Sequence, residues 1–327
     1  MSIDLLEVQG VKCSSVYSGI KKNNALDLSL ISLVKGSKTA AVFTQNIFCA
    51  APVIVAKNHL HSDVEALLIN SGNANAGTGK KGLEHTFESC EILARELLIK
   101  PEQVLPFSTG VIGELLPIDA FKNNANLLVS SLSKDGLRNV AKGILTTDLV
   151  EKSYSTSFRV GENTVTLSGI AKGSGMIRPD MATMLSFIVS DINASSEELQ
   201  DCLTIAVNQS FNRITVDGDT STNDACTLSA TNKSDVQLKD CKNEFQLALN
   251  ELTKELALMI VRDGEGATKF VEVKVGGLDS NKDCLEVAYT VAHSPLVKTA
   301  LFASDANWGR ILAAVGRSKI DGLSINN

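Results

Sequence analysis

Lys172-Gly173-Ser174-Gly175-Met176-Ile177-Arg178-Pro179-Asp180-Met181-Ala182-Thr183-Met184-Leu185 is the most informative segment of this chain. It places Thr183 between a glycine-rich loop and an apolar, strand-like run over residues 184–189. A threonine hydroxyl is a weak nucleophile unless a base lies beside it, and cleavage just before the threonine supplies one, the freed α-amino group. That amine titrates near ~7.7–8.0, so it accepts protons at neutral pH. The pattern alone also fits a loop that enters a buried strand.

The residues before Thr183 suit a cleavage of this kind. Ala182 is small and leaves the carbonyl of the scissile bond open to attack. Pro179 and the run Gly173-Ser174-Gly175 permit a tight, strained approach to that bond. We therefore predict cleavage between Ala182 and Thr183. It would divide the chain into an N-terminal segment, residues 1–182, and a C-terminal segment, residues 183–327, that begins with the nucleophile.

The composition is that of an ordinary globular protein. The 327 residues are 44% hydrophobic and 21% charged, which is enough to bury a large core. The net charge is -6 and there is no dense basic block, so we expect no nucleic-acid partner. The sequence has no run of about 20 apolar residues, so we expect no membrane span. Seven scattered cysteines without a Cys-x-x-Cys pair indicate reduced thiols in the cytoplasm.

Hydrophobic periodicity predicts strands interleaved with helices. Ser195 and Glu198 have the spacing of a capping box at the start of a helix. A second long helix is predicted to stop at Asp263-Gly264. The predicted helices cover residues 87–99, 196–208 and 245–259. The predicted strands cover residues 40–43, 66–69 and 184–189, a hairpin around Gly161-Glu162-Asn163, and two alternating runs, Val271/Val273/Val275 and Leu285/Val287/Tyr289.

The segment around Thr183 closely resembles the self-cleavage motif of the glutamate N-acetyltransferase / ornithine acetyltransferase family of arginine biosynthesis. The resemblance implies an α+β fold, a helix–sheet–sheet–helix sandwich of the self-cleaving ornithine acetyltransferase type, built jointly from both cleaved segments. Other segments match the same family in the same order and extend over nearly the whole chain. They are Asn70-Ser71-Gly72-Asn73-Ala74-Asn75-Ala76, Ser108-Thr109-Gly110-Val111-Ile112-Gly113, Thr146-Thr147-Asp148, residues 215–224, residues 262–269, and Ser304-Asp305-Ala306-Asn307-Trp308-Gly309-Arg310.

The resemblance implies a ping-pong acetyl transfer. The Thr183 hydroxyl would first attack the Ala182 carbonyl, and hydrolysis of the resulting ester would complete the cleavage. Mature Thr183 would then take an acetyl group from N-acetylornithine and pass it to glutamate through an acetyl-threonine intermediate. The implied partners are these small molecules, with no resident cofactor. Acetyl-CoA is a co-substrate of some members, and we find no residue here that decides its use. The family usually assembles as a heterotetramer of two copies of each segment.

The resemblance also assigns roles to individual residues. Thr109 and Gly110 match the oxyanion hole, where donors must face a developing negative oxygen. Thr146, Lys172 and Glu265, together with Thr183, match the substrate-binding positions. Lys172 suits a carboxylate, Thr146 a polar backbone group of the amino acid, and Glu265 a cationic group or the positioning of an amine. Without the family, a lysine beside glycines reads as a surface residue, and Asp-Gly-Glu-Gly reads as a turn.

We expect no metal site. Asp217-Gly218-Asp219-Thr220-Ser221 begins like a calcium loop, but Thr222 occupies the position of the turn glycine. Leu228 occupies the position of the bidentate glutamate.

Two alternative functions compete with acetyl transfer. A threonine-nucleophile amide hydrolase or aminopeptidase would use the same residues, because an acyl-enzyme open to water becomes a hydrolase. A catalytically silent member of the family is the other alternative. Family members continue past the region of Ser318 into a C-terminal segment that contacts substrate, and we expect this chain to lack it. Arg178 adds a charge near the cleavage site where the family usually has a small residue.

Overall fold

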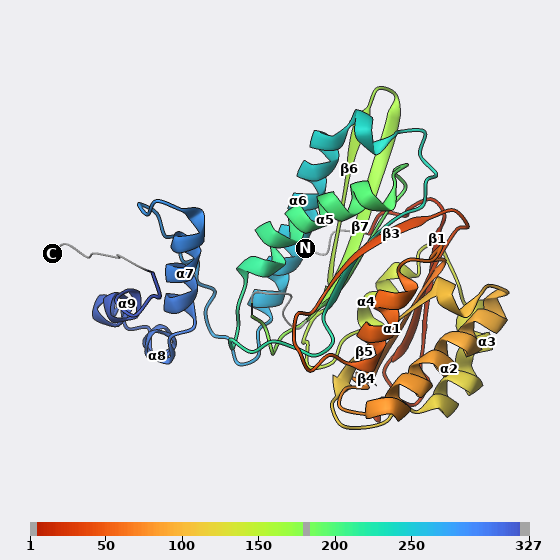
Figure 1. The fold of residues 1–327 in the computed structure, drawn as a ribbon, viewed down its shortest axis with the longest axis horizontal. Coiled ribbons are helices and arrows are strands. Elements are labelled where there is room, and N and C mark those ends of the chain that lie inside the picture. The colour runs from red at the N-terminus through yellow and green to blue at the C-terminus, as the bar shows by residue number, and fades with distance from the viewer. Residues whose placement is uncertain (1–4, 179–183, 321–327) are drawn as a thin grey trace.

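Two β-sheets form the centre of the molecule (Figure 1). The computed structural model describes residues 5–178 and 184–320. One sheet has four strands in the order β1-β2-β4-β5, and the other has five in the order β3-β9-β8-β7-β6. The four-stranded sheet comprises β1 (Val11–Val16), β2 (Leu28–Leu33), β4 (Ala66–Asn73) and β5 (Val104–Val111). The five-stranded sheet comprises β3 (Lys38–Phe43), β9 (Ala225–Ala230), β8 (Leu185–Ser190), β7 (Asn163–Lys172) and β6 (Lys152–Val160).

Helices cover the outer face of each sheet, which gives four layers. α1 (Ala51–His59), α2 (Gly79–Leu97) and α3 (Ile118–Ser130) pack on the four-stranded sheet. α5 (Ser196–Gln209) and α6 (Lys242–Arg262) pack on the five-stranded sheet. Side chains from both sheets interdigitate in the core between them. For example, the ring of Phe107 on β5 packs edge to face on that of Phe187 on β8, with 5.0 Å between the ring centroids. The predicted α+β, helix–sheet–sheet–helix sandwich is confirmed. The short helix α4 (Leu137–Gly143) also packs into this core.

Most of the predicted elements form where their periodicity placed them. The Ser195 hydroxyl accepts the backbone N–H of Glu198, and the Glu198 carboxylate accepts the N–H of Ser195, so α5 begins with the predicted capping box. α6 ends at Arg262 with Asp263 as its C-cap. The hairpin is β6–β7, and the run after Thr183 is β8, which is buried along its whole length. α2 starts eight residues before the predicted helix.

The two alternating runs near the C-terminus were predicted to be strands, and both predictions are wrong. Val271, Val273 and Val275 belong to no strand, because no neighbouring strand pairs with this stretch among the described residues. Leu285, Val287 and Tyr289 lie in α7 (Asn281–Ala292). The Ser280 hydroxyl caps this helix by accepting the N–H of Asp283 at 3.1 Å. Val287 and Val291, four residues apart, form its buried face.

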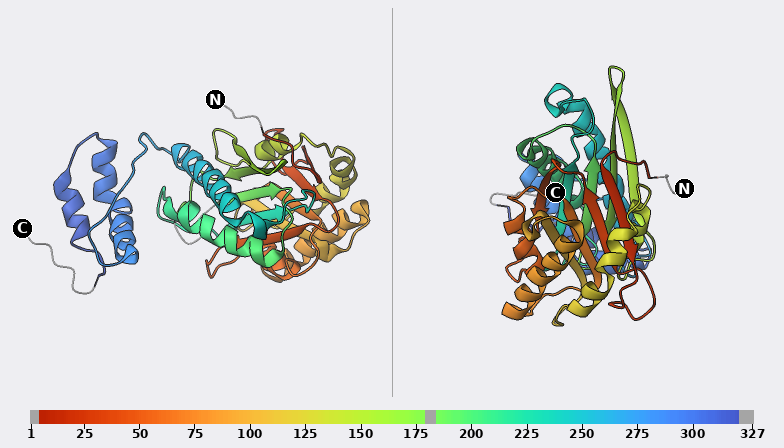
Figure 2. Two further views of the ribbon diagram at one scale, coloured as in Figure 1. Left: turned by 90° about the horizontal axis from the view of Figure 1, so that it is seen from above. Right: turned by 90° about the vertical axis from the view of Figure 1, so that its right-hand side faces the viewer.

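Three helices form a separate C-terminal unit beside the sandwich, coloured blue in Figures 1 and 2. α7, α8 (Pro295–Phe302) and α9 (Trp308–Val315) share a small core that contains Val291, Val297 and Ala314. The unit contacts the sandwich through polar groups. Tyr289 Oη donates to the Asn212 carbonyl, and Lys298 Nζ donates to the Val216 carbonyl. The C-terminal helices therefore contact the segment that connects α5 to β9.

Strands from both sides of the predicted cleavage site share the five-stranded sheet. β8, from the C-terminal segment, pairs antiparallel with β7 of the N-terminal segment and parallel with β9. The division at residues 182 and 183 remains a prediction, and both residues lie outside the described ones. Within residues 5–178 and 184–320, no helix is long and apolar enough to cross a bilayer.

Candidate active site

The predicted oxyanion residues and the predicted substrate lysine meet where the two sheets adjoin. Thr109 and Gly110 lie near the C-terminal end of β5, and Lys172 is the last residue of β7. Thr109 and Lys172 are both buried. Lys172 Nζ donates a hydrogen bond to Thr109 Oγ1 at 3.2 Å. Residues 63 positions apart, from different sheets, thus form one polar centre.

This hydrogen bond suits the role predicted for Thr109. An ammonium group can only donate, so the Thr109 oxygen must be the acceptor. The hydroxyl proton of Thr109 is then left to be donated elsewhere, and the positive charge on Lys172 makes it a stronger donor. Thr109 can therefore donate a hydrogen bond to a developing oxyanion.

Asp148 joins a third predicted residue, Thr146, to this centre. Its Oδ2 accepts the backbone N–H of Thr146 at 3.1 Å and lies 4.0 Å from Lys172 Nζ. Its Oδ1 accepts the N–H of Gly173 at 2.6 Å. One carboxylate thus orders the Thr146 loop, the side chain of Lys172 and the start of the glycine-rich loop.

Lys152 holds Asp148 in turn. Its side chain is fully buried, and Nζ lies 2.6 Å from Asp148 Oδ1 and 2.7 Å from Asp263 Oδ2. Nζ also donates to the carbonyl of Val150 at 3.2 Å. With Lys172, the four buried groups carry two positive and two negative charges. Such a balanced set avoids the large cost of an uncompensated buried charge.

Glu265 reaches the centre through the glycine-rich loop. It follows the C-cap of α6, and its backbone N–H donates to the Ser174 carbonyl at 2.8 Å. Its carboxylate lies against Gly175, where a Cβ would come within 2.8 Å of Glu265 Cδ. The side chain is exposed, so it is accessible to a ligand. Thr109, Gly110, Thr146, Lys172 and Glu265 are therefore brought to one region of the fold.

The predicted cleavage residues Ala182 and Thr183 lie outside the described residues, but the next residue, Met184, is anchored beside this centre. Its N–H donates to Asp224 Oδ1 at 2.9 Å. Asp224 Oδ2 is buried without a hydrogen-bond partner among the described residues. Burial raises the pKa of the Asp224 carboxyl well above its usual value, against the opposing effect of the Met184 N–H.

Asn223 ties the two sheets together at the same place. Its Nδ2 donates to the carbonyls of Ala74 at 2.7 Å and Ser108 at 2.9 Å. Ser108 precedes Thr109 on β5, so this contact fixes the end of β5 against the residues that lead into β9. The motifs that begin at Asn70 and Ser108 thus serve to join strand ends.

Burial has opposite consequences for the two central charges. It lowers the pKa of Lys172, and the nearby negative charge of Asp148 only partly offsets this effect. For Asp148, burial acts to raise the pKa, but Lys172 and Lys152 outweigh it, so the pKa lies below its usual value. Asp148 is therefore ionised at neutral pH, whereas Lys172 loses its proton more readily than a free lysine does.

We expect this shift to appear in the pH dependence of substrate use. As the pH rises through the lowered pKa of Lys172, its charge is lost and a substrate carboxylate binds less well. KM should therefore rise on an alkaline limb that lies below the ordinary lysine value of 10.5. Steady-state kinetics across pH measures this limb. In Lys172→Arg the side chain stays charged, so the limb should vanish; an unchanged limb would assign it to another group.

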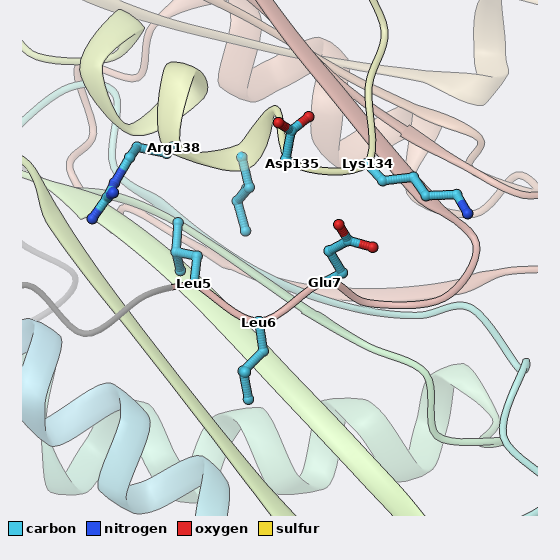
Figure 3. Close-up of a pocket in the computed structure, with 7 residues that line it drawn as sticks. Leu5, Leu6, Glu7, Lys134, Asp135 and Arg138 are labelled. Carbon is cyan, nitrogen blue, oxygen red and sulfur yellow. The ribbon is translucent and has the colours of Figure 1, made fainter.

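A hollow formed by the described residues lies away from this centre. It has a volume of about 270 Å³ and is lined by Leu5, Leu6, Glu7, Lys134, Asp135, Leu137 and Arg138 (Figure 3). It contains none of the predicted site residues. Among residues 5–178 and 184–320, no three His, Cys, Asp or Glu side chains are placed to hold a metal ion. In the segment that resembles a calcium loop, the Asp217 carboxylate instead accepts backbone N–H groups.

Sequence reasoning missed the residues that support the predicted site. Asp148, Asp224 and Asp263 lie inside the matched motifs, but their roles depend on partners far along the chain. Lys152 gave only a weak signal, its spacing of four from Asp148, because a lysine at the start of an alternating strand is usually exposed.

Comparisons with known proteins agree on one family. The ArgJ family matches residues 12–326. The arginine biosynthesis bifunctional protein ArgJ of Pseudomonas syringae pv. tomato is 48% identical over 98% of this chain and 80% of its own length. The protein of the same name from Methylococcus capsulatus is 48% identical over 99% of this chain and 80% of its own length. A crystal structure of arginine biosynthesis bifunctional protein ArgJ from Bacillus halodurans is similar at 35% identity and a TM-score of 0.51, over 56% of this chain and 97% of that one.

Proposed function

The chain belongs to the ArgJ family and is an acyltransferase of arginine biosynthesis, and we propose that it moves an acetyl group from N-acetylornithine to glutamate after cleaving itself at Ala182–Thr183. The observation that carries this proposal is the buried hydrogen bond from Lys172 to Thr109. This bond supports the proposal because it places a buried cation, which can bind a carboxylate, beside a hydroxyl that can donate to an oxyanion, and the chain that follows Thr183 is anchored near them.

The proposed self-cleavage needs one acyl shift and one hydrolysis. The Thr183 hydroxyl attacks the carbonyl carbon of Ala182, the peptide C–N bond breaks, and the nitrogen takes up a proton as the free α-amine. Water then hydrolyses the ester, which leaves a carboxylate on Ala182 and restores the Thr183 hydroxyl. The freed amine is the base for the next reaction.

The proposed transfer uses the same hydroxyl twice. Thr183 takes the acetyl group from the amide nitrogen of N-acetylornithine, and ornithine leaves with its amine protonated. The amine of glutamate then attacks the acetyl ester and releases Thr183. Thr109 and Gly110 would stabilise the oxyanion in both steps. Lys172 would bind the α-carboxylate that both amino acids carry, Thr146 a polar backbone group, and Glu265 a cationic group.

We propose that the enzyme is cytoplasmic, works on small molecules and has no resident cofactor. Two copies of each cleaved segment would assemble into a heterotetramer. Acetyl-CoA would be an additional acetyl donor only if it acetylates Thr183 in place of N-acetylornithine.

Intact mass under denaturing conditions is the first test. Two fragments that meet at Ala182–Thr183 are the expected result, and a single uncut chain would contradict the proposal. The purified protein is then given N-acetylornithine labelled in the acetyl group, with or without glutamate. Labelled N-acetylglutamate is expected, with parallel double-reciprocal plots that mark a ping-pong scheme. Release of acetate at the same rate without glutamate would favour the hydrolase, and acetyl-CoA as donor forms a separate arm.

A further inference from the structure

One loop holds the chain on both sides of the predicted cleavage site. This loop, residues 214–224, runs from the end of the short helix after α5 to the start of β9, and we call it the clamp loop. It contacts Met176 and Ile177 before the site and Met184 after it. Residues 179–183 themselves lie outside the described residues, so the observations concern Met176 and Ile177 before them and Met184 after them.

Asp217 makes the upstream contact. Its Oδ2 accepts the N–H of Met176 at 2.5 Å, and its Oδ1 accepts the N–H of Ile177 at 2.9 Å. Oδ1 also accepts the N–H of Asp219 at 3.1 Å. Hydrogen bonds to a charged acceptor are about twice as strong as neutral ones. One carboxylate thus binds two successive amides of the approach to the cleavage site.

The carbonyl of Ile177 is also hydrogen-bonded to the clamp loop. It accepts the N–H of Val216 at 2.9 Å and the hydroxyl of Thr215, also at 2.9 Å. Met176, just before it, has a φ of +54°, which is uncommon for a residue with a side chain. Such a conformation persists only where its surroundings impose it. The Asp217 carboxylate, bound to the amide of Met176, provides that constraint.

Asp224 makes the downstream contact. Its Oδ1 accepts the N–H of Met184, and the Met184 carbonyl accepts the N–H of Ala225 at 3.1 Å. Asp224 is buried, and its backbone carbonyl accepts the N–H of Thr44 of the sandwich at 3.0 Å. This end of the clamp loop is therefore fixed to the sheet core.

The C-terminal helices brace the same loop from outside. His293, the C-cap residue of α7, has Nε2 3.0 Å from Thr215 Oγ1. Because the Thr215 hydroxyl donates its proton to Ile177, His293 must donate from Nε2. The upstream half of the clamp loop is thus held between α7 and the approach to the cleavage site.

We propose that Asp217 and Asp224 are positioning residues for self-cleavage, which hold the chain before and after residues 179–183 and so bring the Thr183 hydroxyl to the Ala182 carbonyl. The inference rests on the proposed self-cleavage. It adds to the reaction two carboxylates that act through the backbone. An attack between adjacent residues depends steeply on geometry, since a misplacement of ~1 Å can cost about 10²-fold in rate.

The test follows the loss of uncut chain after synthesis, by intact mass, in full-length variants. Asp217→Asn keeps one acceptor oxygen but turns an NH₂ group towards the second amide, and we expect cleavage to slow roughly 10- to 100-fold. Asp217→Glu should recover most of the rate, because it restores the carboxylate. Asp224→Ala removes the acceptor of the Met184 N–H and should slow cleavage to a similar degree. Asp219→Asn makes the same charge change in the same loop and should cleave at the wild-type rate.

Thermal melting and circular dichroism show which variants are folded. Wild-type cleavage rates in folded Asp217→Asn and Asp224→Ala would overturn the proposed role of the clamp loop while leaving the proposed function intact. An equal slowing in Asp219→Asn would also overturn it, since loop charge would then be the cause. If Asp217→Asn does not fold, a folded Asp224→Ala with wild-type cleavage overturns the proposal. An uncut wild-type chain would overturn the proposed self-cleavage and the clamp together.

Discussion

Gly110→Ala is expected to lower acetyl transfer by roughly 10²–10³-fold, the loss that follows removal of one oxyanion donor. A Cβ at Gly110 would lie 2.3 Å from the carbonyl carbon of Gly72 and 2.5 Å from the backbone nitrogen of Asn73. These are backbone atoms of β4, so the contact cannot be relieved by turning a side chain. The end of β5 must move away from β4, and Thr109 must move with it.

The close approach arises where the parallel pairing of β4 and β5 becomes irregular. Gly72 and Gly110 face each other in the ladder, and the register shifts at the next residue of β4, Asn73. Gly110 has a φ of +135°, and Gly72 has a φ of +101°. Two glycines without Cβ atoms let the ends of β4 and β5 approach this closely.

Gly113→Ala is the matched control for this prediction. Gly113 also has a positive φ, +89°, but in the described part of the chain no heavy atom other than those of its chain neighbours lies within 4 Å of the Cβ it would gain. It therefore reports the strain of the backbone conformation without the collision. Initial rates of N-acetylglutamate formation and the melting temperature should be measured for both variants. Comparable losses of activity in the two would remove the steric argument and the role of Gly110.

Lys152→Met is expected to destabilise the protein by about 3–5 kcal/mol, the usual cost of leaving a buried charge without its partner. The variant keeps an unbranched side chain, one atom shorter, but leaves Asp148 and Asp263 without the cation between them. Both carboxylates are almost fully buried, so water cannot replace the ammonium group. Urea unfolding at neutral pH measures the loss.

The pH dependence of this loss identifies its cause. In the wild type the pKa of Asp148 lies below its usual value, so its contribution to stability is present at neutral pH and is lost as the pH falls through that pKa. In Lys152→Met the pKa of Asp148 loses the lowering effect of the Lys152 charge, so Asp148 takes up a proton more readily and its repulsion with Asp263 is relieved. The difference between wild type and variant should therefore shrink as the pH is lowered.

An exposed ion pair provides the comparison for Lys152. Lys122 Nζ lies 2.7 Å from Glu88 Oε1, a distance equal to that between Lys152 and Asp263, but both side chains are well exposed. Lys122→Met should change the urea midpoint little, because water solvates the remaining carboxylate. Equal shifts of the urea midpoint in Lys152→Met and Lys122→Met would mean that the destabilisation comes from losing any lysine and does not depend on burial.

Periodicity and capping fixed those elements whose signal is local. α5 and α6 have apolar residues at helical spacing, and the N-terminus of α5 closes with its own capping box. The alternation of Leu285, Val287 and Tyr289 wrongly predicted a strand. Val287 is also four residues from Val291, which is helical spacing, and the Ser280 cap favours the helix. A short alternating run fits both periods, and packing decides between them.

By itself, the sequence determined the family and the mixed strands and helices of the sandwich, and through the family's motifs it named candidate catalytic and substrate residues. The family and the helices and strands are encoded in side-chain chemistry and spacing within short segments. Only the tertiary structure decided that Lys172 meets Thr109, that Lys152 is buried between Asp148 and Asp263, and that the clamp loop holds Met176, Ile177 and Met184. Charges far apart in the chain become partners only when burial removes water and makes pairing necessary.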